Sequence, residues 1–106
     1  MLALQMFTKG IEVMGEASNN TIANIYYHRA VVHAYLGIWN EAINDIDRAI
    51  EKSEDNIPKY FYLRGLCFAC CQSFKQAIHD LSVCLSINEN YAEAFLMRSK
   101  CLQIEG

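Results

Sequence analysis

The sequence predicts an all-α protein built from antiparallel helical hairpins, and three observations lead to this prediction. The 106-residue chain is 53% hydrophobic, which is too apolar for a disordered chain. It contains five Gly and one Pro, which is too few turn formers for an all-β fold. Apolar residues recur three and four positions apart, as at Ala42, Ile46 and Ala49, and the sequence repeats itself after 34 or 35 residues.

The internal repeat is clearest between residues 23–56 and 58–91. A shift of 35 residues aligns the segment Tyr26-Tyr27-His28-Arg29-Ala30 with the segment Phe61-Tyr62-Leu63-Arg64-Gly65. A further shift of 34 carries aromatic, basic, small and thiol side chains of the second unit onto Phe95, Arg98, Ser99 and Cys101. Because residue types match position by position, the chain contains two full units and part of a third.

Capping signals divide each unit into two helices. Gly37 suits the left-handed residue that ends a helix, and Asn40 suits the cap that begins the next one. Pro58 marks another start, because Pro is tolerated in the first turn of a helix and not in its interior. Together with the apolar period, these signals predict helices at residues 2–16, 22–37, 40–53, 57–71, 74–87 and 91–104.

Charge and hydropathy exclude several classes of function. Nine basic and 12 acidic residues give a formal net charge of −3, without the positive excess that nucleic-acid binding needs. No apolar run approaches the roughly 20 residues of a membrane span, and the N-terminus lacks the pattern of a secretion signal. We therefore expect no nucleic-acid or membrane partner and a cytoplasmic location, with the nucleus as the alternative.

The five cysteines resemble a metal or redox motif at first sight, because Cys67, Cys70 and Cys71 lie close together. A structural zinc site needs four ligands, usually from two separated pairs, and Cys84 and Cys101 form no second pair. Cys67 and Cys101 occupy the same position of the repeat, so we interpret these cysteines as small buried apolar side chains. An odd number of cysteines also fits free thiols in a reducing compartment. We predict no metal and no cofactor.

Nothing in the sequence predicts an enzyme. His28, His33 and His79 raise the question of a base or a ligand. No serine or thiol nucleophile with an orienting carboxylate lies at a recognisable spacing from them. We expect plain polar contacts from these histidines and a non-enzymatic protein.

Basic and acidic residues also follow the repeat. Arg29, Arg64 and Arg98 share one position, and Asp45 and Asp80 lie sixteen residues after the first two. This spacing predicts ion pairs between facing helices, which fix register more than they add stability. The alternative is a column of guanidinium groups that grips an acidic peptide.

The repeat resembles the tetratricopeptide repeat family, whose unit has about 34 residues and alternates bulky and small signature positions. The signature positions hold Tyr26, Ala30, Ala42, Ala49, Phe61, Gly65, Ala77, Cys84, Phe95 and Ser99. The resemblance implies one domain over residues 1–106, a right-handed α-α superhelix (a solenoid) of antiparallel hairpins. Residues 2–16 would be the second helix of a partial repeat, 23–56 and 58–91 full repeats, and 92–106 the first helix of another partial repeat. Two features depart from the family pattern, His33 and the missing closing Pro.

The resemblance also implies a scaffold or adaptor that binds a peptide or protein partner. In this family the first helix of each hairpin lines a concave groove. The matching positions hold Asn24, Tyr27, His28, Val31, Tyr35, Lys59, Tyr62, Leu63, Leu66, Cys70, Glu93, Leu96, Met97 and Lys100. Tyrosine and aliphatic side chains suit an apolar peptide. The alternatives are a structural segment of a larger assembly, self-association through the uncapped half-repeats at both ends, and an accessory module of an enzyme encoded elsewhere in a longer chain.

Some members of the family clamp the C-terminal carboxylate of chaperone tails with Lys, Asn and Arg side chains. The matching positions here hold Tyr27, Val31, Leu63, Glu93 and Met97. None of these residues keeps the clamp, and Glu93 would repel an acidic tail. We therefore do not expect chaperone tails as partners.

Overall fold

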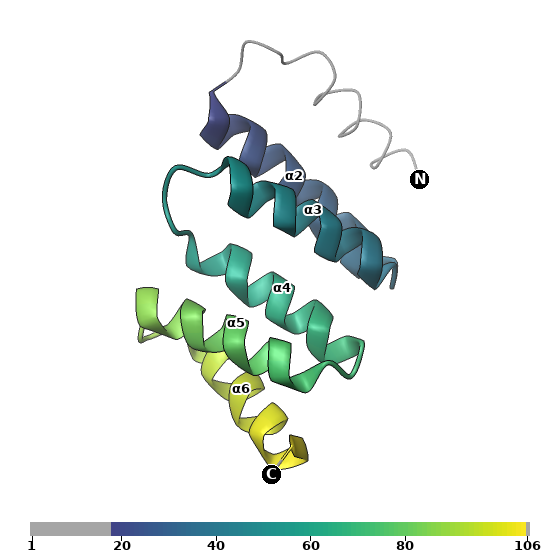
Figure 1. Ribbon diagram of the computed structural model, residues 1–106, viewed down its shortest axis with the longest axis vertical. Helices are drawn as coiled ribbons and strands as arrows, with labels where there is room; N and C mark the ends of the chain where they lie inside the picture. Colours follow the sequence, from purple (N-terminus) through teal and green to yellow (C-terminus); the bar gives the residue numbers. More distant parts are fainter. Residues whose placement is uncertain (1–17, 106) are drawn as a thin grey trace. The chain divides into compact units, whose positions relative to one another are not determined.

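The computed structural model describes residues 18–105, and over this range the secondary structure is α-helical with turns between the helices (Figure 1). The described helices are α2 (Asn19–Tyr35), α3 (Trp39–Lys52), α4 (Pro58–Cys70), α5 (Phe74–Ile87) and α6 (Ala92–Glu105). The predicted all-α class is confirmed. The helix predicted at residues 2–16 lies outside the described residues.

The observed helix ends agree with the predicted ones to within three residues, and local contacts explain the differences. Helix α2 begins at Asn19 because Ser18 caps it, with the Ser18 Oγ accepting a hydrogen bond from the Thr21 backbone N–H. Pro58 is the first residue of α4, one position after the start of the helix predicted at 57–71. The cap predicted at Asn40 is wrong: α3 begins at Trp39 after Ile38, with no side-chain hydrogen bond at this end.

The chain divides into two compact units, Met1–Asn56 and Ile57–Gly106. In the first unit α2 packs on α3, and in the second α4 packs on α5 and α5 packs on α6. Within each unit, helices that follow one another in sequence run antiparallel (Figure 1). The boundary between the units lies one residue before Pro58, the predicted start of the second full repeat.

Small residues let the two helices of each hairpin approach closely. Six of the signature positions are buried, namely Ala30, Ala42, Ala49, Gly65, Ala77 and Cys84. At Gly65 the approach is closest, because a Cβ there would lie 2.9 Å from the Leu81 Cγ. A larger residue at this position would therefore push α4 away from α5.

The core of the second unit combines α5 with residues of α6. Its buried members are Ala77, Leu81, Cys84, Ala94 and Cys101. Aromatic and aliphatic side chains of α4, α5 and α6 cover this cluster, among them Phe61, Tyr62, Phe68 and Met97. This core fixes α4 and α6 on either side of α5 and so positions the groove described below.

The turn inside each hairpin has the same backbone form. Gly37 has φ 76°, as its predicted role as a left-handed helix end requires, and Gln72 has φ 63° at the matching repeat position. The residue after each one donates its N–H to a carbonyl five positions earlier, from Ile38 to His33 and from Ser73 to Phe68.

Candidate functional site

An arginine and a buried aspartate join the two helices of each hairpin. In the first unit the Arg29 Nη2 lies 2.6 Å from the Asp45 Oδ1, and in the second the Arg64 Nε lies 2.8 Å from the Asp80 Oδ2. Asp45 is 3% exposed and Asp80 2%. The hydrogen bond to Asp45 raises the pKa of Arg29 above its ordinary value. The predicted ion pairs are confirmed for these two arginines, whose charge is therefore neutralised inside the hairpins.

The two hairpins differ in the residue beside this ion pair. The His33 Nδ1 lies 2.7 Å from the Asp45 Oδ2, which confirms the polar contact predicted for this histidine. The matching position in the second unit holds Phe68. Asp45 therefore has two side-chain partners, and an aromatic ring takes the place of the second partner beside Asp80.

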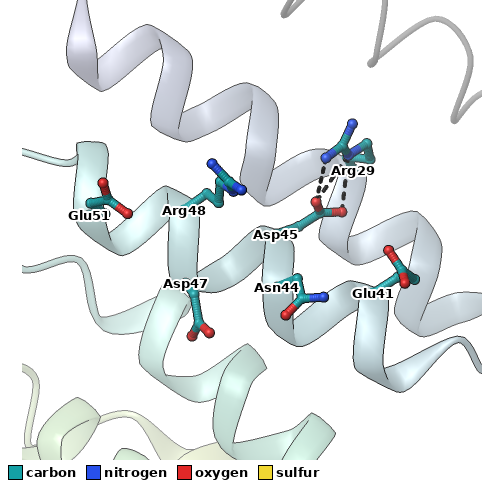
Figure 2. Close-up of a pocket in the computed structure, with 7 residues that line it drawn as sticks. All are labelled: Arg29, Glu41, Asn44, Asp45, Asp47, Arg48 and Glu51. Carbon is teal, nitrogen blue, oxygen red and sulfur yellow. Dashed lines mark hydrogen bonds and ion pairs between the residues drawn. The ribbon is translucent and has the colours of Figure 1, made fainter.

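A polar cavity of about 570 Å³ opens beside the first ion pair (Figure 2). It is lined mainly by α3, with residues Arg29, Glu41, Asn44, Asp45, Asp47, Arg48 and Glu51. Figure 2 shows Arg29 and Asp45 facing one another, while Arg48 and Glu51 lie farther along α3. Within residues 18–105 no group of three or more His, Cys, Asp or Glu side chains could hold a metal ion. The side chains that line the cavity are all polar or charged.

The matching cavity in the second unit has a volume of about 360 Å³ and is mainly apolar. Its lining includes Arg64, Asp80, Phe68 and His79. Phe68 contributes apolar surface to this cavity, whereas the matching residue His33 does not line the first one.

A third cavity, of about 360 Å³, lies between the end of α4, the start of α5 and α6. We name it the α4–α6 groove, and its lining residues are Leu66, Ala69, Cys70, Gln72, Phe74, Met97, Lys100, Cys101 and Ile104. Most of the lining is apolar, and Lys100 is the only charged residue in this set. Such a surface can accept apolar side chains from a ligand and can offer an ammonium group at one point.

The structure brings four of the predicted groove residues together in this cavity, namely Leu66, Cys70, Met97 and Lys100. Sequence reasoning missed the other five. Ile104 continues the spacing of Met97 and Lys100 along α6, so the helical period was a signal that could have found it. Gln72 lies in the turn after α4 and Phe74 is the first residue of α5, and at both places periodicity gives little signal.

Other predicted groove residues of the second unit lie outside the cavity. The Tyr62 ring lies 5.2 Å from the Tyr91 ring between centroids. Burial and the nearby Glu93 carboxylate raise the pKa of Tyr62 above its ordinary value. Leu96 is 61% exposed, whereas Leu63 is buried and presents little surface to a ligand. Lys59 is exposed at the start of α4.

The remaining predicted groove residues belong to the first unit, on α2, and are Asn24, Tyr27, His28, Val31 and Tyr35. The Tyr27 and His28 rings meet edge to face, with centroids 5.5 Å apart. Tyr35 is 90% exposed at the end of the helix. None of these five residues is part of the lining of the α4–α6 groove.

The cysteines fall into two groups. Cys67, Cys84 and Cys101 are buried, as predicted, whereas Cys70 and Cys71 are exposed at the end of α4. All five are free thiols. Burial raises the pKa of the Cys67 thiol to about 12, so this thiol stays protonated near neutral pH.

The chain matches no protein-family model and no curated protein. The similarity to tetratricopeptide repeats therefore rests on the internal repeat and its residue types. Among the helices described between residues 18 and 105, none combines the length and the apolar character needed to cross a membrane.

Proposed function

We propose that the chain is a non-enzymatic protein-interaction module of the tetratricopeptide type, with its hairpins arranged as a solenoid. The observation that carries this proposal is the α4–α6 groove, an open and mainly apolar cavity. Four of its lining residues occupy positions at which the family resemblance implies partner contacts. Binding here would need no chemistry from the protein beyond shape, apolar surface and one cation.

The repetition of specific contacts supports the assignment to this type of repeat. Each hairpin pairs an arginine with an aspartate sixteen residues later. Each also turns through a left-handed residue, Gly37 or Gln72. A sequence unit that recurs together with its contacts is typical of repeat proteins whose hairpins stack on one another.

The lining of the groove defines the chemistry of its ligand. Met97 and Ile104 offer flexible and branched apolar surface, and Phe74 offers an aromatic ring. Lys100 favours a carboxylate placed beside these apolar contacts, because a charge-assisted hydrogen bond strengthens where water is partly excluded. The proposed ligand is therefore a short peptide with clustered apolar side chains and an adjacent acidic group.

A random-peptide display library tests the proposal against the whole chain. We expect enrichment of peptides that combine apolar and acidic residues. Ile104→Asp should abolish this enrichment, because Ile104 is 63% exposed and its replacement alters the groove with little effect on folding. Lys100→Glu should remove the preference for acidic residues and leave the apolar preference in place.

The matched control is Gln76→Asp, which adds the same charge as Ile104→Asp at an exposed position of α5 outside the groove. Peptides selected by the wild type should bind this control equally well. Selection of no consensus, or binding that survives Ile104→Asp unchanged, would show that the groove is not a peptide site.

The competing assignment is a structural or self-association segment, and the exposed apolar residues of α6 favour it. Light scattering over a concentration series distinguishes the two functions. A mass that stays monomeric leaves the groove available for a peptide. A concentration-dependent dimer that Ile104→Asp dissociates would mean that a second copy occupies the groove.

A further inference from the structure

Helix α6 carries the same residue types through which α2 and α4 contact the second helix of their hairpins. We name them the α6 receiving face, which consists of Phe95, Arg98, Ser99 and Leu102. A shift of 34 residues places them on Phe61, Arg64, Gly65 and Phe68 of α4. The α6 receiving face is distinct from the α4–α6 groove, because none of its four residues lines that cavity.

On α4 this set of positions holds α5 in place. Gly65 admits the Leu81 side chain, and Arg64 binds the buried carboxylate of Asp80. The Arg64 guanidinium also lies over the Phe61 ring, 5.7 Å from its centroid. Small, basic and aromatic residues at these spacings thus form one surface that recognises a helix.

Helix α2 repeats the arrangement. Arg29 binds Asp45 and lies over the Tyr26 ring at 5.4 Å. Ala30 takes the small position and is fully buried. Both hairpins therefore recognise the incoming helix through the same three features.

On α6 the same positions have no such helix among residues 18–105. Phe95 is 55% exposed and Leu102 50%. The Ser99 Oγ donates a hydrogen bond to the Phe95 carbonyl of its own helix, so this hydroxyl group does not require a hydrogen-bond acceptor from an incoming helix. Arg98 has no carboxylate partner within the described range, and its hydrogen bond goes to the Ser82 Oγ at 3.4 Å.

We propose that the α6 receiving face binds an amphipathic helix of a partner that carries the pattern Ala-x-x-Asp followed by Ile or Leu. This is the pattern that α3 and α5 present to their hairpin partners, at Ala42, Asp45 and Ile46 and again at Ala77, Asp80 and Leu81. The aspartate would pair with Arg98, the alanine would approach near Ser99, and the aliphatic residue would cover Phe95 and Leu102.

The partner helix comes from outside residues 1–106. Within this chain the pattern occurs only in α3 and α5, where the aspartates are already buried against Arg29 and Arg64. A second folded copy therefore cannot offer either helix. Residues 1–17 contain no aspartate. The charge complementarity of Arg98 thus points to a different polypeptide segment.

A peptide of residues Trp39–Lys52 is the probe. It carries the pattern, and many of its other residues are charged, which favours solubility. Titrated into the ¹⁵N-labelled chain, it should shift resonances of α6 at and around Arg98. Asp45→Asn in the peptide should weaken binding about tenfold, as loss of a charge-assisted hydrogen bond implies. Arg98→Ala in the chain should weaken it to a similar extent, and Lys75→Ala, which removes the same charge from α5, should not.

A charge exchange makes the test specific. The Arg98→Asp chain should reject the wild-type peptide and should bind the Asp45→Arg peptide. Equal binding of the wild-type and Asp45→Asn peptides, or shifts confined to helices other than α6, would overturn the proposal. A concentration-dependent dimer that Leu102→Asp dissociates would also overturn it, by assigning the face to a second copy.

Since an isolated helix of this length is marginally stable in water, a second format keeps the test decisive. The peptide is appended after Gly106 through a flexible linker, which raises its effective concentration at α6. The fusion should raise the melting temperature of the chain, and the Asp45→Asn form of the appended peptide should raise it less. Equal melting temperatures for both fusions and the unfused chain would refute the proposed recognition.

Discussion

Gly37 and Gln72 occupy the same left-handed position in the turns of successive hairpins, with φ values of 76° and 63°. Glycine has no Cβ and adopts this conformation freely, whereas an L side chain at positive φ is strained. The second hairpin therefore keeps the turn of the first without the residue that suits it best. The contacts around the turn hold Gln72 in this conformation, since Gln72 and Ser73 donate their N–H groups to carbonyls near the end of α4.

Replacing Gln72 by Gly should stabilise the protein by about 1 kcal/mol, because it removes this backbone strain. The reverse change, Gly37→Gln, should destabilise it by about the same amount. A Cβ at Gly37 would meet no atom within 4 Å, so this cost is one of backbone conformation rather than crowding. Urea denaturation of the three proteins measures both effects. A Gln72→Gly variant less stable than the wild type would contradict the assigned turn.

Replacing Asp80 by Ala should destabilise the protein by about 2–3 kcal/mol, since it removes the carboxylate that binds the partly buried Arg64 guanidinium. Glu89→Ala, which removes an exposed carboxylate, is the control and should change stability by less than about 0.5 kcal/mol. The double variant Arg64→Leu/Asp80→Leu should recover most of the loss, because no buried charge remains. Thermal melts check this order, and a double variant as unstable as Asp80→Ala would argue against it.

Gly65→Ala should destabilise the protein by about 1–3 kcal/mol, because the new Cβ would lie 2.9 Å from the Leu81 Cγ. Alanine is otherwise the better helix former by about 1 kcal/mol, so the sign of the change reports crowding against α5. Ser99→Ala is the matched control at the same repeat position of α6 and should be neutral or slightly stabilising. If Gly65→Ala raises the melting temperature, the close approach of α4 and α5 is wrong.

Stability should fall as the pH rises above about 9, in part through Cys67. Burial raises the pKa of this thiol from 9.0 to about 12, so the folded state keeps a proton that the unfolded state loses. The stabilisation is fully present below pH 9 and is lost as the pH rises toward 12. Denaturation midpoints from pH 8 to 11 should decline more steeply in the wild type than in Cys67→Ala. Parallel pH dependences in the two proteins would count against the burial of this thiol.

The sequence was sufficient to predict the all-α class, the ends of the described helices to within three residues, and the ion pairs of Arg29 and Arg64. These features depend on local spacing and on a repeat that supplies two independent copies of the same pattern. Arg29 and Arg64, for example, were both expected to meet an aspartate sixteen residues later, and both do. Gly37 marked a helix end because glycine adopts a positive φ freely, and Pro58 marked a helix start because Pro is excluded from the interior of a helix.

The candidate site was only partly predictable, for two physical reasons. Its lining combines α4, α6, the turn before α5 and the first residue of α5, and a helical period cannot anticipate what a turn residue such as Gln72 covers. Burial also depends on packing between helices rather than on spacing within one, which is why Leu63 is buried although its position implied an open groove. Asn40 lies within the first turn of α3 because the backbone there starts one residue earlier without a side-chain cap.

The arrangement of the thiols gives the second unit a built-in reporter of local opening. Cys70 and Cys71 lie at the surface, whereas Cys67, Cys84 and Cys101 mark the interior faces of α4, α5 and α6 in turn. An alkylating reagent that acts only on accessible thiols would modify the first two directly and each of the others when its own helix separates from the core. Mass spectrometry of the labelled protein would then give the order in which the three helices open.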